Sequence, residues 1–151
     1  LRVVGSGNWP EFGLAYRHLD RVDFVGFADD LNAEYAQATA SICPIFEGAG
    51  TQIKVIESCA FGRPVVTSAF SADGFGKEIA DHLIVAQDKN SFVAGCLTLL
   101  RDPQQALRIG KTLRGIQQRQ FSRASFIDKL RSEILSLTAR PTAEPFMEVS
   151  Q

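Results

Sequence analysis

ICPIFEGAGTQIKVIESCAFGRPVVTS, residues Ile42–Ser68, contains a strand, a small-residue loop, a helix and a second strand in that order. The apolar run Ile42–Phe46 predicts a short buried strand, and Gln52–Phe61 has the periodicity of a helix. Gly62-Arg63-Pro64 ends that helix, and Val65–Ser68 predicts the second buried strand. This order is typical of a parallel sheet with helical crossovers.

The loop in this stretch, Glu47–Thr51, leads directly into the helix. The first N–H groups of a helix lack partners and its dipole favours negative charge, so such a loop can bind an anion. Gly48 and Gly50 would let a phosphate approach the backbone closely, although glycine is also the commonest residue of plain turns. Thr51 is the expected N-cap of the helix.

Charged residues of the helix extend this interpretation. Lys54 lies in the first turn, where a cation opposes the helix dipole, and a bound diphosphate would remove that conflict. Glu57 lies on a helix that is apolar on most of its circumference, where a carboxylate needs partners. Ribose hydroxyls would supply them, and a Lys54–Glu57 surface pair is the alternative. Because Glu47 and Glu57 bracket the loop, the pattern favours a nucleotide-sugar over a bare phosphate.

Strand-like and helix-like runs alternate on both sides of this stretch, which predicts an α/β, Rossmann-like parallel sheet with flanking helices. We expect strands over residues 1–5, 22–26, 40–46, 64–68 and 82–86, helices over 10–19, 52–61 and 78–80, a helix capped by Asp29 or Asp30 and running to about residue 38, and a glycine-bearing loop over 70–77. Helices alone follow, over 89–100, 103–120 and 122–137. The domain would span residues 1–138, and 139–151 would be a mobile tail.

Composition excludes several classes of protein. A chain of 151 residues is one domain that can bury a core, and its net charge of -1 argues against a nucleic-acid partner. No apolar run reaches the about 18 residues of a transmembrane segment, and no signal peptide is recognisable. The three cysteines, Cys43, Cys59 and Cys96, have no CxxC spacing, which is typical of reduced packing residues in a cytoplasmic protein. A peripheral position at the inner membrane face of a full-length protein stays open.

No pattern of ligands indicates a metal or a cofactor. Neither His18 nor His82 has a plausible nucleophile beside it, and Asp29-Asp30 is better explained as a helix start than as a metal motif. Gly5-Ser6-Gly7 is similar to a dinucleotide-binding loop, but residue 10 is Pro10, so the glycine fingerprint is incomplete. We therefore expect no metal and no cofactor.

Two stretches together resemble a known family. Residues 22–38 contain V-x-F-x-G-x-x-D-D-L followed by Y-x-x-A, and Pro44, the glycine loop and K-V-I-E-S-C-A-F-G-R-P-V-V come next. They resemble the C-terminal, donor-binding domain of the retaining group 1 glycosyltransferases of GT-B architecture, over the chain to about residue 135. The glycine loop joined to Glu57 and the G-x-P-V-V strand is the specific part, and the terminal helices are generic.

The resemblance implies two Rossmann-like domains facing each other across a cleft, with the nucleotide-sugar held by the C-terminal one and no metal required. It implies Glu57 at the ribose hydroxyls, the segment Gly48, Ala49, Gly50 and Thr51 with Lys54 at the diphosphate and donor sugar, the Gly26-Phe27 backbone at the nucleobase, and Gly5 at a strand end in the cleft.

The chain departs from the family pattern at Glu47, the candidate catalytic residue. Nine residues separate Glu47 from Glu57, more than in the usual motif, whose spacing would place Ala49 at the first acidic position. Glu47 therefore either reaches the donor sugar from a longer loop or has no such role. The family's upstream basic pair and acceptor domain are also missing. Because the sequence opens at Leu1 inside a strand, we expect an incomplete GT-B half, preceded in a longer protein by about 150–250 residues that form the acceptor domain and one more strand.

Three functions follow as hypotheses. The first is the donor-binding domain of a glycosyltransferase that moves a sugar from a nucleoside-diphosphate sugar to an acceptor with retention, inactive without the N-terminal domain. The second is a non-catalytic nucleotide-sugar binding or regulatory module, which the unusual spacing of Glu47 favours. The third, a dinucleotide oxidoreductase, would need the full glycine fingerprint.

Overall fold

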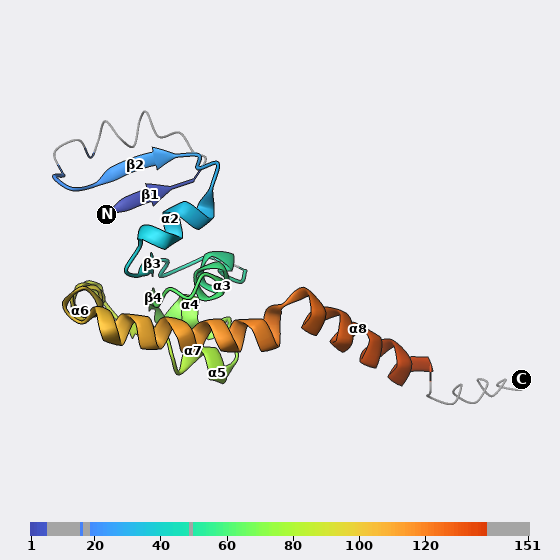
Figure 1. Cartoon of the computed structure of the whole chain (residues 1–151). Helices are drawn as coiled ribbons and strands as arrows, with labels where there is room; N and C mark the ends of the chain where they lie inside the picture. The colour runs from blue at the N-terminus through green and yellow to red at the C-terminus, as the bar shows by residue number, and fades with distance from the viewer. Residues whose placement is uncertain (6–15, 17–18, 49, 139–151) are drawn as a thin grey trace, which may run out of the picture.

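The computed structural model describes residues 1–5, 16, 19–48 and 50–138 (Figure 1). The strands are β1 (Arg2–Val4), β2 (Asp23–Gly26), β3 (Ser41–Cys43), β4 (Val65–Ser68) and β5 (Ile84–Ala86). The helices are α2 (Leu31–Gln37), α3 (Ile53–Ala60), α4 (Ala69–Asp73), α5 (Lys77–Ala80), α6 (Lys89–Arg101), α7 (Pro103–Phe121) and α8 (Arg123–Thr138). The helix expected over 10–19 and the tail expected over 139–151 fall outside the described residues.

The described strands form two parallel sheets. One pairs β1 with β2, and the other has the order β3-β4-β5. Helix α2 connects them along the chain (Figure 1). Its N-cap is Asp30, whose side chain accepts a hydrogen bond from the Asn32 N–H at 2.9 Å. An ion pair of 2.8 Å between Arg2 and Glu34 ties α2 to β1. The expectation of a Rossmann-like α/β fold with parallel strands is confirmed.

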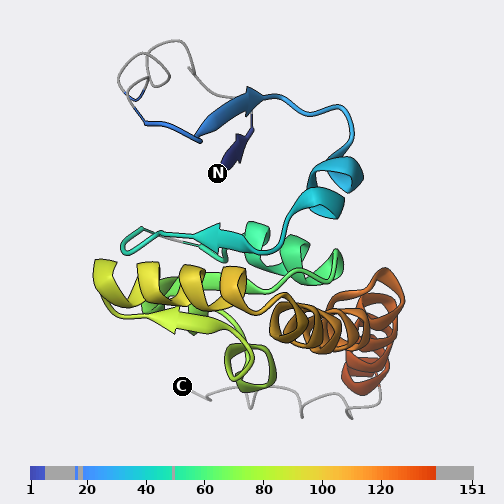
Figure 2. The same cartoon turned by 60° about the vertical axis from the view of Figure 1, so that its left-hand side comes forward.

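Strand β4 is the centre of the core. All four of its residues are buried, and helices cover both faces of its sheet (Figure 2). Because successive side chains point to opposite faces, Val65 packs in a cluster with Val55 of α3, Ile79 of α5 and residues of α7. Val66 packs instead with Leu99 and other residues on the α6 side. A continuous apolar strand covered on both faces is what a parallel sheet requires.

The ends of three elements differ from the sequence prediction. Strand β3 ends at Cys43, because Pro44 has no N–H to extend the ladder. Strand β5 begins at Ile84 rather than at residue 82, because the N–H groups of His82 and Leu83 donate to carbonyls of α5. Part of the loop expected over 70–77 is the helix α4, whose first turn is capped by Ser68.

The C-terminal part consists of helices alone, as expected. A reciprocal pair of bonds between Asp88 and Ser91 caps α6, and Asp102 caps α7 with Pro103 at its first position. Helix α8 has no buried residue and projects from the rest of the molecule beyond α7 (Figure 1). None of the described helices combines the length and the apolar character that a membrane span needs.

Candidate functional site

The candidate site is the loop between β3 and α3, at the carboxyl end of β3. Gly48 and Gly50 have φ angles of 141° and 83°, a region that residues with a side chain rarely adopt. A Cβ added to either glycine would meet no atom within 4 Å. Backbone conformation therefore requires these glycines, and the space beside them is open to a ligand. Ala49 lies outside the described residues.

The N-terminus of α3 faces this loop without a side-chain cap. The expectation that Thr51 caps the helix is wrong: the N-cap is Gln52, and the described residues give it no side-chain cap. The Gln52 side chain instead donates to the Gly50 carbonyl at 3.2 Å. Lys54 lies exposed in the first turn. An uncapped helix start with a lysine and an adjoining glycine loop is chemically suited to an anion.

Glu57 has a partner that the sequence did not predict. The Tyr35 hydroxyl on α2 donates to the Glu57 carboxylate at 3.2 Å, and the Tyr35 ring stacks on Phe61 with centroids 4.3 Å apart. Burial, reinforced by the Glu57 charge, raises the pKa of Tyr35 well above its ordinary value. The Lys54–Glu57 pair is not among the ion pairs of the described residues. The signal in the sequence was the tyrosine of Y-x-x-A, which by itself indicates only the family.

Glu47 is exposed in the same loop. It precedes Gly48 directly, at the start of the segment that the two glycines shape, and Glu57 lies half-buried on α3. Nothing in the geometry assigns Glu47 to a reacting atom, so its catalytic role stays a prediction.

Gly5, Gly26 and Phe27 lie at the carboxyl ends of β1 and β2. The Gly5 N–H donates to the Gly26 carbonyl at 2.7 Å, and Gly26 has a φ of 76°. The Phe27 side chain is 75% exposed. The structure thus brings the two predicted glycines together on the first sheet, whereas the loop and Glu57 belong to the second.

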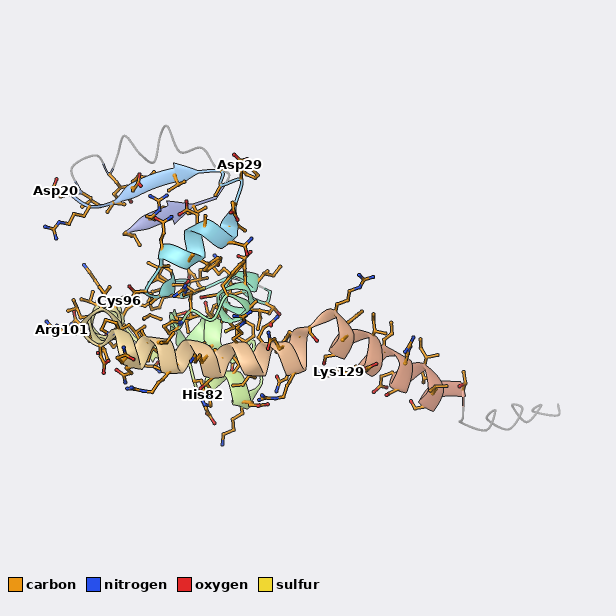
Figure 3. All side chains as sticks on the ribbon, in the orientation of Figure 1. Asp20, Asp29, His82, Cys96, Arg101 and Lys129 are labelled. Atoms are coloured by element: carbon orange, nitrogen blue, oxygen red, sulfur yellow. The ribbon has the colours of Figure 1, made fainter. Side chains whose placement is uncertain are left out.

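His82, Cys59 and Cys96 add no catalytic group to the candidate loop. In the described part of the chain, no three His, Cys, Asp or Glu side chains gather as metal ligands would. His82 lies on the side of the molecule opposite to β1 and β2 (Figure 3), with Nδ1 3.0 Å from the Glu78 carbonyl. Burial raises the pKa of the Cys59 thiol to about 11, and also raises the pKa of Cys96. Both thiols are therefore neutral at physiological pH and are unsuited to nucleophilic catalysis.

A parallel sheet with helices on both faces and a glycine loop at a strand's carboxyl end defines a Rossmann-like α/β domain. Comparison with known proteins then gives the family. Residues 1–102 match the family described as "Glycosyl transferases group 1". The chain belongs to this family, and its fold is that of a GT-B glycosyltransferase domain. No curated protein matches it significantly.

Two solved structures show the likeness in three dimensions. Sucrose-phosphate synthase from Thermosynechococcus elongatus matches with a TM-score of 0.68 and 26% identity, over 92% of this chain and 38% of that one. WaaG, a glycosyltransferase involved in lipopolysaccharide biosynthesis, matches with a TM-score of 0.66 and 19% identity, over 90% of this chain and 38% of that one. The chain therefore spans well under half the length of each.

Proposed function

We propose that this chain is the donor-binding, C-terminal domain of a glycosyltransferase that moves a sugar from a nucleoside-diphosphate sugar to an acceptor with retention. Membership of the group 1 family supports sugar transfer. The observation that carries the donor assignment is the uncapped start of α3 beside an open loop whose two glycines have positive φ angles. The Glu57 carboxylate lies on the same helix.

The diphosphate would lie against the Gly48–Thr51 backbone and the first turn of α3. There the helix N–H groups and Lys54 stabilise the negative charge that develops on the leaving diphosphate. Glu57, about one turn into α3 at 3.6 residues per turn, would accept hydrogen bonds from the ribose hydroxyls. Glu47 would face the donor sugar. Neutralisation by N–H groups and a lysine needs no metal, so EDTA should leave nucleotide affinity unchanged, and restoration of binding by magnesium would contradict this part.

The first sheet would serve the nucleobase and the cleft. The Gly26-Phe27 backbone would read the base edge and Gly5 would border the cleft. We further propose that the acceptor is bound by an N-terminal domain of the same protein outside these 151 residues, because the chain corresponds to 38% of each of the two structures described above. The chain alone would then bind donor but not transfer sugar, since nothing would position the nucleophile. The three unpaired cysteines favour a cytoplasmic location.

The test is calorimetric titration with UDP-, GDP-, ADP- and TDP-sugars, in the wild type and in Glu57→Gln. The substitution keeps the size of the side chain and removes its charge, so affinity should fall by about 1–3 kcal/mol, the value of a hydrogen bond to a charged group. Glu133→Gln, which removes the same charge from exposed α8, is the matched control and should bind like wild type. Unchanged affinity in a folded Glu57→Gln variant would remove Glu57 from the site.

A second candidate is a non-catalytic nucleotide-sugar binding or regulatory module on the same fold. The exposed position and unusual spacing of Glu47 favour it. Nucleotide-sugar binding by the full-length protein, with no transfer to any acceptor and no donor hydrolysis, would decide for the module. Transfer that is lost in Glu47→Gln would decide for the enzyme.

A further inference from the structure

A group of buried hydroxyls lies directly beneath the candidate loop. Ser68, the last residue of β4, is 0% exposed, and Ser71 on α4 is 2% exposed. Both side chains donate to the carbonyl of Ile45, Ser71 at 3.0 Å and Ser68 through a short bond. Ser68 also accepts from the Ser71 N–H at 3.1 Å, and Ser71 lies 3.6 Å from the Cys43 thiol.

The two serine hydroxyls share one acceptor, the Ile45 carbonyl oxygen. Ile45 lies beyond the end of β3, so its carbonyl has no ladder partner, and a carbonyl oxygen has two lone pairs. Each serine can donate its one hydroxyl proton to that carbonyl, and the Ser68 hydroxyl also lies 3.2 Å from the Ser71 hydroxyl oxygen, within hydrogen-bonding distance. Each serine oxygen also accepts, Ser68 from the Ser71 amide and Ser71 from the weak Cys43 S–H donor. A buried polar group of this kind holds a single geometry, because a missing partner would leave a buried acceptor unsatisfied.

The other end of the loop lies close to the same corner of the fold. A Cβ added to Gly74, the residue that ends α4, would lie 4.0 Å from the Thr51 Cα. Ile45 and Thr51 bracket the segment that contains Glu47, Gly48 and Gly50. The corner formed by the end of β4 and α4 therefore hydrogen-bonds the chain before this segment and lies close to the chain after it, while the glycines between face open space.

We propose that Ser68 and Ser71 are positioning residues that hold the β3–α3 loop in its diphosphate-binding conformation. This inference rests on the proposed function for its ligand. Among the described residues, no hydrogen bond joins either serine to the loop glycines or to the first turn of α3. They act through the Ile45 carbonyl, two residues before Glu47.

The experiment compares the Ser68→Ala/Ser71→Ala double variant with wild type in the full-length protein. Thr67→Val is the matched control, because Thr67 is equally buried on the same strand, but its hydroxyl reaches Cys43 O at 3.4 Å rather than the loop. Hydrogen–deuterium exchange at sub-second labelling times, read on a peptide covering residues 46–52, measures the order of the loop without a ligand. Titrations with UDP, GDP, ADP and TDP measure diphosphate affinity, and circular dichroism confirms that each variant is folded.

We expect exchange in residues 46–52 to become several-fold faster in the double variant and to stay at the wild-type rate in Thr67→Val. Affinity for the diphosphate that wild type binds should fall about tenfold in the double variant, which corresponds to about 1.4 kcal/mol, and be retained in the control. If the double variant does not fold, Ser71→Ala alone should show the same changes at smaller size, since Ser68 still holds the carbonyl.

Two results separate failure of this inference from failure of the proposed function. Equal exchange and equal diphosphate affinity in wild type and a folded serine variant would overturn the inference and leave the donor site standing. Faster loop exchange in the variant, with no diphosphate bound by wild type, would show that the serines order the loop but would refute the donor site, and with it the role proposed for them.

Discussion

Replacing Gly110 by alanine should destabilise the protein, although alanine is the better helix former. Gly110 lies buried in the middle of α7, where this helix crosses the end of α3. A Cβ at this position would lie 2.0 Å from the carbonyl oxygen of Gly62 and 2.8 Å from its carbonyl carbon. These are backbone atoms beyond the end of α3, so no side-chain rotation can relieve the overlap.

The size of the effect follows from that distance. Non-bonded carbon and oxygen atoms stay about 3.3 Å apart, so the two segments would have to separate by about 1.3 Å. Overpacking of this kind costs about 1–3 kcal/mol or more, against a gain of about 1 kcal/mol in helix propensity. Because the overlap is with backbone, we expect a cost at the upper end of this range and a net loss of about 2 kcal/mol, which lowers the melting temperature by about 4–8 °C in a chain of this size.

Gly115→Ala on the same helix is the matched control. Its added Cβ would meet only the flexible end of Arg119, at 3.5 Å, so the propensity gain of up to about 1 kcal/mol should remain. Urea unfolding followed by circular dichroism should therefore place the two variants on opposite sides of wild type, about 3 kcal/mol apart. If Gly110→Ala proved as stable as Gly115→Ala, the inference that α7 and Gly62 are too close to admit a Cβ at residue 110 would be refuted.

Three further predictions concern side chains. Tyr35→Phe removes the hydrogen bond to Glu57 but keeps the ring stack on Phe61, so calorimetry should show a smaller loss of nucleotide affinity than in Glu57→Gln; a larger loss would give Tyr35 a direct role. Hydrogen bonds from Ser91 lower the pKa of Asp88 below its ordinary value of 3.8, so its stabilising contribution is present above that value and is lost as the pH falls through the lower, folded value. Urea midpoints between pH 7 and about pH 3 should fall more steeply in wild type than in Asp88→Asn, which caps without titrating, and parallel curves would contradict this. Burial raises the pKa of Cys59 to about 11, so iodoacetamide at about pH 8 should label Cys59 only after unfolding; labelling of the folded protein at the rate of a free thiol would show that Cys59 is accessible.

The order of the elements and the place of the candidate loop could be predicted from the sequence. Both depend on local patterns: apolar runs for β3 and β4, helical periodicity for α3, and glycine or proline where each ends. Gly48 and Gly50 adopt positive φ angles, which agrees with the special loop conformation that two glycines at these positions indicate. The family resemblance, stated from these motifs, is confirmed over residues 1–102.

Partners distant in sequence could not be predicted. Tyr35 and Glu57 are 22 residues apart, and Ser71 and Ile45 are 26 apart. Neither spacing carries a periodic signal, because the contact depends on how α2 and α4 pack against the sheet. The helix cap was missed for a related reason. Thr51 has the right chemistry, but the loop's path ends the turn one residue later, at Gln52.

The division into two sheets was also settled only by tertiary structure. Each strand can be predicted from a short apolar run. Such a run does not indicate which neighbouring strand it pairs with, since backbone hydrogen bonds are alike at every position. The pairing of β1 with β2 and of β4 with β3 and β5 follows from where the helices bury their apolar faces. The sequence therefore determined which residues could form the candidate site, and the packing of the helices on the sheets decided which of them lie together.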